Sequence, residues 1–186
     1  MHPDVALFRL INNLTLVLPA PLSAFFRFMA VGAPFLFGAV FILLWFFAAR
    51  QAAVRRAVVL AVLSGVLALA LNFIISHLWN RLRPFAVLHH VHQLVAHAPY
   101  HSFPSDHAAG SFAFATVMFL AGRFWGWAFL VTAVVVAFAR VYVGVHWPSD
   151  VAGGAVVGFL AARVVLAERR ELEPLVRRVV RILPRR

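Results

Sequence analysis

Cysteine is absent from this chain of 186 residues, and so is lysine. Without cysteine there is no disulfide, thiolate metal site or thiol nucleophile, so any nucleophile must be another residue type. Without lysine, all 17 basic residues are arginines, and only 6 acidic residues oppose them, which leaves a formal net charge of +11. The arginines stand between and beyond apolar runs, which favours anionic lipid headgroups rather than nucleic acid as their partners.

Apolar residues make up 63% of the chain and charged residues 12%. No charged residue lies between Arg27 and Arg50 or between Arg56 and Arg81. Each run is long enough for a helix that crosses about 30 Å of hydrocarbon. Three further segments predict spans at residues 105–122, 124–144 and 147–167. The predicted fold class is all-α, a polytopic membrane helical bundle of about five spans.

The two ends of the chain are amphipathic. Residues 4–18 and 172–183 predict helices that lie on the membrane surface as anchors. We expect no cleaved signal peptide, because charged residues occur early and the first apolar run is long. The chain is predicted to form a single membrane-embedded domain over residues 1–186, with its core at about residues 57–167.

The arginines also predict an orientation in the membrane, because short cytoplasmic loops are enriched in them. Arginines join spans one and two, join spans three and four, and follow span five. The N-terminus is therefore expected outside, and residues 81–104 and the turn at His146 at the outer face. The arginines used are Arg50, Arg55, Arg56, Arg123, Arg169, Arg170, Arg177, Arg178, Arg181, Arg185 and Arg186.

Ionisable residues near the span ends converge on that outer face. They are Arg83, Asp106, His107, Arg140, His146 and Asp150. Such residues are costly beside lipid and point to function. Arginines bind phosphate, histidines attack or donate a proton, and a carboxylate orients a histidine. The set predicts phosphoryl transfer at the outer interface.

The spacing of these residues resembles a known family. The chain carries Arg83-Pro84, then Pro104-Ser105-Asp106-His107, then Arg140 followed by His146 and Asp150 as Arg-x5-His-x3-Asp. These resemble the three signatures of the type 2 phosphatidic acid phosphatase superfamily over about residues 76–154. Arg-Pro-Phe at 83–85, a histidine-rich outer loop and an aspartate before the second-motif histidine resemble its bacterial undecaprenyl pyrophosphate phosphatases.

The resemblance implies a role for each residue. His146 would be the nucleophile that forms a phosphohistidine, Asp150 would hydrogen-bond its other ring nitrogen, and His107 would protonate the departing oxygen. Phosphate binding would fall to Arg83, Ser105, Arg140 and Asp106, although Asp106 equally suits a helix cap. No metal or cofactor is implied. The expected reaction is hydrolysis of undecaprenyl or another polyprenyl pyrophosphate to the monophosphate, which recycles the lipid carrier for cell-wall synthesis.

Several alternatives stay open. Ser76 occupies the position of the family's lysine, and His77 or Arg81 are candidate replacements. Other phosphorylated lipids could be substrates: phosphatidylglycerophosphate, phosphatidic acid or diacylglycerol pyrophosphate. A transporter would scatter its charges through the membrane depth, whereas a scaffold would need no catalytic histidine. The cluster His89, His90, His92, His97 and His101 admits a metal site, a pyrophosphate-contacting or pH-sensing loop, or plain loop polarity. The sequence indicates no oligomeric state.

Overall fold

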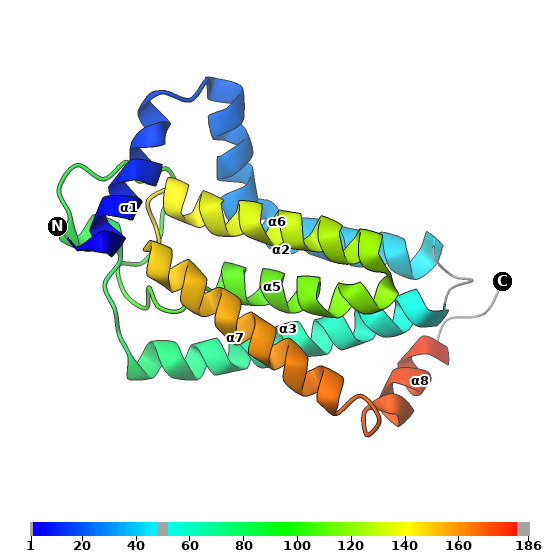
Figure 1. Cartoon of the computed structure of the whole chain (residues 1–186). Coiled ribbons are helices and arrows are strands. Elements are labelled where there is room, and N and C mark those ends of the chain that lie inside the picture. The colour runs from blue at the N-terminus through cyan, green and yellow to red at the C-terminus, as the bar shows by residue number, and fades with distance from the viewer. Residues whose placement is uncertain (1, 48–51, 182–186) are drawn as a thin grey trace.

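The structure is a computed structural model that describes residues 2–47 and 52–181 (Figure 1). Every regular element in these two ranges is a helix, which confirms the predicted all-α class. The elements are α1 (Pro3–Asn12), η1 (Asn13–Leu16), α2 (Ala20–Phe47), α3 (Ala52–Leu78), α4 (Pro84–Val87), α5 (Asp106–Met118), η2 (Phe119–Ala121), α6 (Arg123–Tyr142), α7 (Pro148–Ala167) and α8 (Glu173–Arg181). Arg50, Arg185 and Arg186, used for the orientation, lie outside the described residues.

Four helices are long and apolar enough to cross a membrane, namely α2, α3, α6 and α7. They match the first, second, fourth and fifth predicted spans. The third predicted segment, residues 105–122, forms α5 and η2. Helix α5 has 13 residues, about 20 Å at 1.5 Å per residue, and it packs among α3, α6 and α7 (Figure 1). The chain is a multi-pass membrane protein.

Glycines allow α5 and α7 to approach closely. A Cβ atom on Gly158 would lie 2.1 Å from the backbone oxygen of Ala109, and one on Gly154 would lie 2.4 Å from that of Ser105. Small residues at such contacts are a common device in membrane helix packing. The close contact holds the start of α5 against the second and third turns of α7, near the two motifs at the starts of these helices.

Large apolar side chains cover much of the outside of the bundle. Phe35 of α2 is 80% exposed and Phe73 of α3 is 65% exposed. Side chains of this size on long apolar helices suit contact with lipid.

The two amphipathic segments form helices at opposite ends of the bundle (Figure 1). Helix α8 lies at one end, where Glu173 pairs with Arg56 at 3.2 Å. Helix α1 lies at the other end beside residues 81–104, and Asn12 donates hydrogen bonds to the backbone oxygens of Tyr142 at 2.8 Å and His92 at 3.0 Å. The expected surface anchor is therefore docked onto the bundle.

Candidate active site

A tight turn between α6 and α7 presents His146. Gly144 adopts a φ of +83°, and a Cβ atom there would lie 2.7 Å from the backbone oxygen of His92, so the turn requires glycine. The side chain of His146 is only 3% exposed. The backbone nitrogen of Trp147 donates to Oδ2 of Asp150 at 2.8 Å, which caps the start of α7 directly after the histidine.

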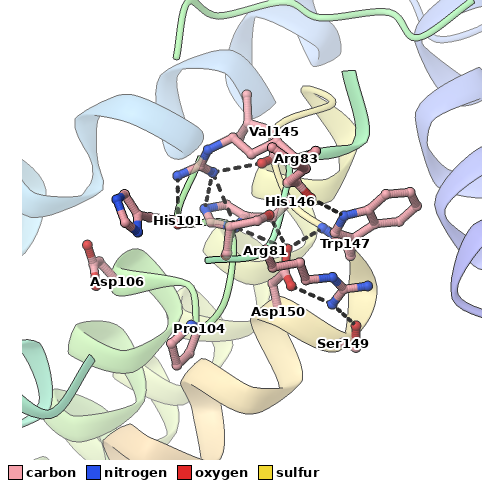
Figure 2. A network of polar contacts seen from close by, with 12 residues as sticks. Arg81, Arg83, His101, Pro104, Asp106, Val145, His146, Trp147, Ser149 and Asp150 are labelled. Carbon is pink, nitrogen blue, oxygen red and sulfur yellow. Dashed lines mark hydrogen bonds and ion pairs between the residues drawn. The ribbon is translucent and has the colours of Figure 1, made fainter. Parts of the chain in front are cut away.

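The imidazole of His146 is held in one tautomer. Its Nδ1 atom lies 2.8 Å from the backbone oxygen of Ser102, which can only accept, so Nδ1 carries the proton. Nε2 then keeps its lone pair and accepts from Nη1 of Arg83 at 3.0 Å (Figure 2). The expected hydrogen bond from Nδ1 to Asp150 is corrected: the Ser102 carbonyl accepts from Nδ1, and Oδ2 of Asp150 lies 3.5 Å from that atom.

Asp150 is fully buried and surrounded by donors. The hydroxyl of Ser102 and the backbone nitrogen of Trp147 donate to its Oδ2, while Nη1 of Arg81 donates to its Oδ1 at 2.7 Å (Figure 2). These bonds come from three separate segments and fix the orientation of the carboxylate beside the histidine ring.

Two buried arginines lie close to this histidine. Arg83 precedes α4, and its Nη1 also donates to the backbone oxygen of Val145 at 2.8 Å. Arg140 lies in the last turn of α6 and donates from Nη1 to the backbone oxygen of Ala30 at 2.8 Å. Their Nε atoms are buried and have no hydrogen-bond partner among the described residues. Two guanidinium groups with unused donors suit an anion such as phosphate.

The start of α5 brings the second motif to the same place. The backbone nitrogen of Ser105 donates to the backbone oxygen of Asp150 at 3.0 Å, which ties α5 to α7. The Ser105 hydroxyl is buried without a partner in the described chain. His107 is partly buried and lies within electrostatic range of Arg140 and Arg83. Exposed Asp106 accepts from Asn72 at 2.9 Å, so its direct contact is with α3 rather than with the arginines.

The electrostatics of the site favour a neutral His146 imidazole beside charged arginines. Burial lowers the pKa of His146 well below its ordinary range, and the positive charges of Arg140 and Arg83 lower it further. Burial also lowers the pKa of Arg83, but only to about 10, so that side chain stays cationic at neutral pH. Partial burial, with Arg83 and Arg140, lowers the pKa of nearby His97 to about 4.

Both candidate replacements for the family's lysine, Arg81 and His77, contact other groups of the protein. Arg81 is occupied by Asp150, by Ser149 at 2.6 Å and by Asp4 at 2.6 Å. His77 stacks on His101 with ring centroids 4.7 Å apart, and its Nδ1 bonds the backbone oxygen of Phe73.

The histidines at positions 89–101 form no metal-binding group in the described part of the chain. Within residues 2–47 and 52–181, no group of three or more histidine, cysteine or acidic residues has the arrangement to hold a metal ion. Two members of the cluster do meet the site. The ring of His97 lies 6.3 Å from that of His146 between centroids, and the backbone oxygen of His101 accepts from Arg83 at 3.2 Å.

Four residues that matter to this site were absent from the predicted set of site residues, although Arg81 was considered as a replacement for the family's lysine and His97 as a member of the histidine cluster. Ser102 and His97 lie in the loop before the second motif, while Arg81 and Asp4 enter through their contacts with Asp150 and Ser149. A signal existed for Asp4, because it is one of only 6 acidic residues in the chain. His97 had a signal in its place within the histidine-rich segment, whereas Ser102 had none, since serine is an ordinary residue in a polar loop.

Fold and site together define a multi-pass helical membrane protein in which arginines and histidines converge at one end of the bundle. Comparison with known proteins identifies the group to which it belongs. The family model described as PAP2 superfamily matches residues 56–172, and the chain belongs to that superfamily. It is a PAP2 membrane phosphatase.

Individual relatives agree with this assignment. Undecaprenyl-diphosphatase BcrC of Bacillus subtilis is 35% identical over 143 residues, or 77% of this chain and 72% of that protein. The crystal structure of Aquifex aeolicus LpxE is similar with a TM-score of 0.74 and 29% identity, and covers 90% of this chain and 96% of that one. A PAP2 type phosphatidylglycerolphosphate phosphatase from Bacillus subtilis shares the fold, with a TM-score of 0.65, 22% identity and coverages of 92% and 89%.

Proposed function

We propose that this protein hydrolyses undecaprenyl pyrophosphate, or a related polyprenyl pyrophosphate, to the monophosphate and so recycles the lipid carrier for cell-wall synthesis. The observation that carries the chemistry is buried His146, with Nδ1 on the Ser102 carbonyl and Nε2 facing Arg83. The name of the Bacillus subtilis relative, an undecaprenyl-diphosphatase, supports this substrate class.

In the proposed first step, the phosphate oxygens draw Arg83 away from Nε2 of His146, and the freed lone pair attacks the terminal phosphorus. A P–N bond forms as the bridging P–O bond breaks. His107, in the protonated form that the negative charge of the bound pyrophosphate favours, gives its proton to the departing oxygen of the polyprenyl monophosphate. Arg83 and Arg140 stabilise the charge on the phosphoryl oxygens. Asp150, 3.5 Å from Nδ1, stabilises the positive charge that the ring acquires.

In the second step, water attacks the phosphohistidine and gives its proton to His107. The P–N bond breaks, its electron pair returns to Nε2 of His146, and inorganic phosphate leaves. The Ser105 hydroxyl, which has no partner in the described chain, and the backbone N–H groups in the first turn of α5 would bind the phosphate oxygens. We keep Asp106 as a rim residue of this phosphate site, where its charge acts on Arg83 and Arg140.

We further propose that the site faces the outside of a bacterial cytoplasmic membrane. Arginines gather at the opposite end of the bundle, beside α8, where Arg56, Arg169, Arg170 and Arg177 line one surface pocket. Cytoplasmic ends of membrane helices are enriched in such residues. The active-site end, with α1 and residues 81–104, would then meet the pyrophosphate headgroup at the outer surface while the prenyl chain stays in lipid.

Phosphate release by the detergent-purified protein tests the proposal. Undecaprenyl pyrophosphate, phosphatidic acid and phosphatidylglycerophosphate are compared in the presence of EDTA. We expect preference for the prenyl substrate, retained under EDTA, and loss of turnover in His146→Ala and His107→Ala although both variants still insert into membranes. Preference for a glycerolipid would replace the proposed substrate. Near-normal turnover in either histidine variant would refute its proposed role.

A further inference from the structure

One carboxylate of helix α1, that of Asp4, contacts residues beside the active site. Helix α1 lies outside the part of the chain that matches the family model. Asp4 accepts at Oδ2 from Nη2 of Arg81 at 2.6 Å and from the hydroxyl of Ser149 at 2.6 Å, and at Oδ1 from the backbone nitrogen of Ser149 at 2.9 Å. Its side chain is only 9% exposed. Helix α1 is thereby joined to the start of α7, next to Asp150.

The same helix is fixed by packing as well as by hydrogen bonds. Phe8 is 1% exposed and packs on Trp147, with ring centroids 5.5 Å apart. Asn12 also accepts from the backbone nitrogen of His92 at 3.0 Å. These contacts hold helix α1, and with it Asp4, beside the turn between α6 and α7.

Arg81 connects Asp4 to Asp150, the carboxylate beside His146. Its Nη1 donates to Oδ1 of Asp150, its Nη2 donates to Asp4, and its guanidinium lies 5.2 Å from the centre of the Trp147 ring. Burial raises the pKa of Asp4, but hydrogen bonds from Ser149 and Arg81 outweigh it and hold the pKa below its ordinary value. Asp4 is therefore anionic at neutral pH.

We propose that Asp4 and Arg81 are positioning residues that act through Asp150 and set the net charge beside His146. With both carboxylates ionised, Asp4, Arg81 and Asp150 together carry one net negative charge. That charge favours the cationic ring that forms when His146 takes the phosphoryl group. Without the charge of Asp4, Arg81 is neutralised by Asp150 alone, and the negative potential at the ring falls.

This inference rests on the proposed phosphohistidine role of His146 and is tested by a double-variant cycle. Asp4→Asn keeps the shape of the side chain and removes its charge, Arg81→Gln removes the opposite charge, and the double variant has the net charge of the wild type. The exposed pair Glu173→Gln and Arg177→Gln, whose wild-type side chains lie 2.7 Å apart at the other end of the bundle, is the matched control.

We expect Asp4→Asn to lower kcat roughly tenfold, the lower end of effects seen for groups that act through another residue, with KM changed less than about twofold. The double variant should recover most of that loss, and the control variants should match the wild type. A double variant that is as impaired as the product of the two single losses would overturn the inference, because a merely structural role gives no charge rescue.

The same assay separates this inference from the proposed function. Full activity in His146→Ala would remove the proposed function itself. An inactive His146→Ala together with no rescue in the double variant would leave the proposed function standing and overturn only the role of Asp4 and Arg81. Thermal unfolding of each variant in detergent confirms that all are folded when compared.

Discussion

The hydroxyl of Ser102 donates a hydrogen bond to Oδ2 of Asp150. The backbone oxygen of the same serine accepts from Nδ1 of His146 at 2.8 Å. One loop residue therefore contacts both the proposed nucleophile and its neighbouring carboxylate. Its backbone oxygen binds His146, and its side-chain hydroxyl binds Asp150. This division makes the contribution of each contact measurable.

Ser102→Ala removes the bond to Asp150 and keeps the carbonyl that fixes the tautomer of His146. We expect kcat to fall about 10- to 100-fold, which is the equivalent of the roughly 1.5–3 kcal/mol of a hydrogen bond to a charged group. Steady-state phosphate release measures it. Ser64→Ala is the control, because that buried hydroxyl bonds within its own helix α3, to the backbone oxygen of Leu60 at 2.8 Å. Equal kcat in the two variants would contradict the role of Ser102.

Arg140→Lys and Arg83→Lys each keep a positive charge and lose the planar set of donors that matches a phosphate group. We expect kcat/KM to fall by roughly 100-fold in each, about 2.7 kcal/mol of transition-state stabilisation. Arg55→Lys is the matched control, since Arg55 is also buried but bonds the backbone oxygen of Trp45 at 3.0 Å. If lysine at position 83 or 140 supports normal turnover, bidentate phosphate binding there is wrong.

The low pKa of His146 predicts activity in mildly acidic buffer. A group whose pKa is lowered stays neutral to lower pH, whereas an imidazole with the ordinary pKa of about 6.5 would be only about one quarter neutral at pH 6. We therefore expect kcat/KM, which reports the free enzyme, to show no loss centred near pH 6.5 from this residue. Phosphorus NMR of the substrate over the same range corrects for its own ionisation. A loss centred near pH 6.5 that remains after this correction would contradict the neutral state of His146.

The contact between α5 and α7 predicts a stability difference between two glycines. Gly158→Ala places a methyl group against the backbone of Ala109, and we expect it to destabilise the fold by about 1–3 kcal/mol. A Cβ atom on Gly110 of α5 would meet no described atom within 4 Å beyond its chain neighbours and the adjacent backbone of its own helix. For Gly110→Ala we therefore expect no loss and a helix-propensity gain of roughly 0.5–1 kcal/mol. Thermal unfolding in detergent measures both. Equal stability of the two variants would mean that the helices are not in close contact.

The membrane-spanning helices were predictable because each depends on a local property. The uncharged runs that end near Arg50 and Arg81 correspond to α2 and α3, since run length alone decides whether a helix can cross lipid. The short length of α5 was less predictable, because it depends on the packing of that helix among α3, α6 and α7.

The sequence by itself determined the helical membrane class and named the residues of the three motifs, because hydrophobicity and motif spacing are written along the chain. Only the tertiary structure decided that the Ser102 carbonyl, rather than Asp150, bonds the ring of His146, and that Asp4 of α1 reaches Arg81. Those partners are 44 and 77 positions apart. Which donor reaches which acceptor depends on how distant segments pack, and no local pattern encodes that distance.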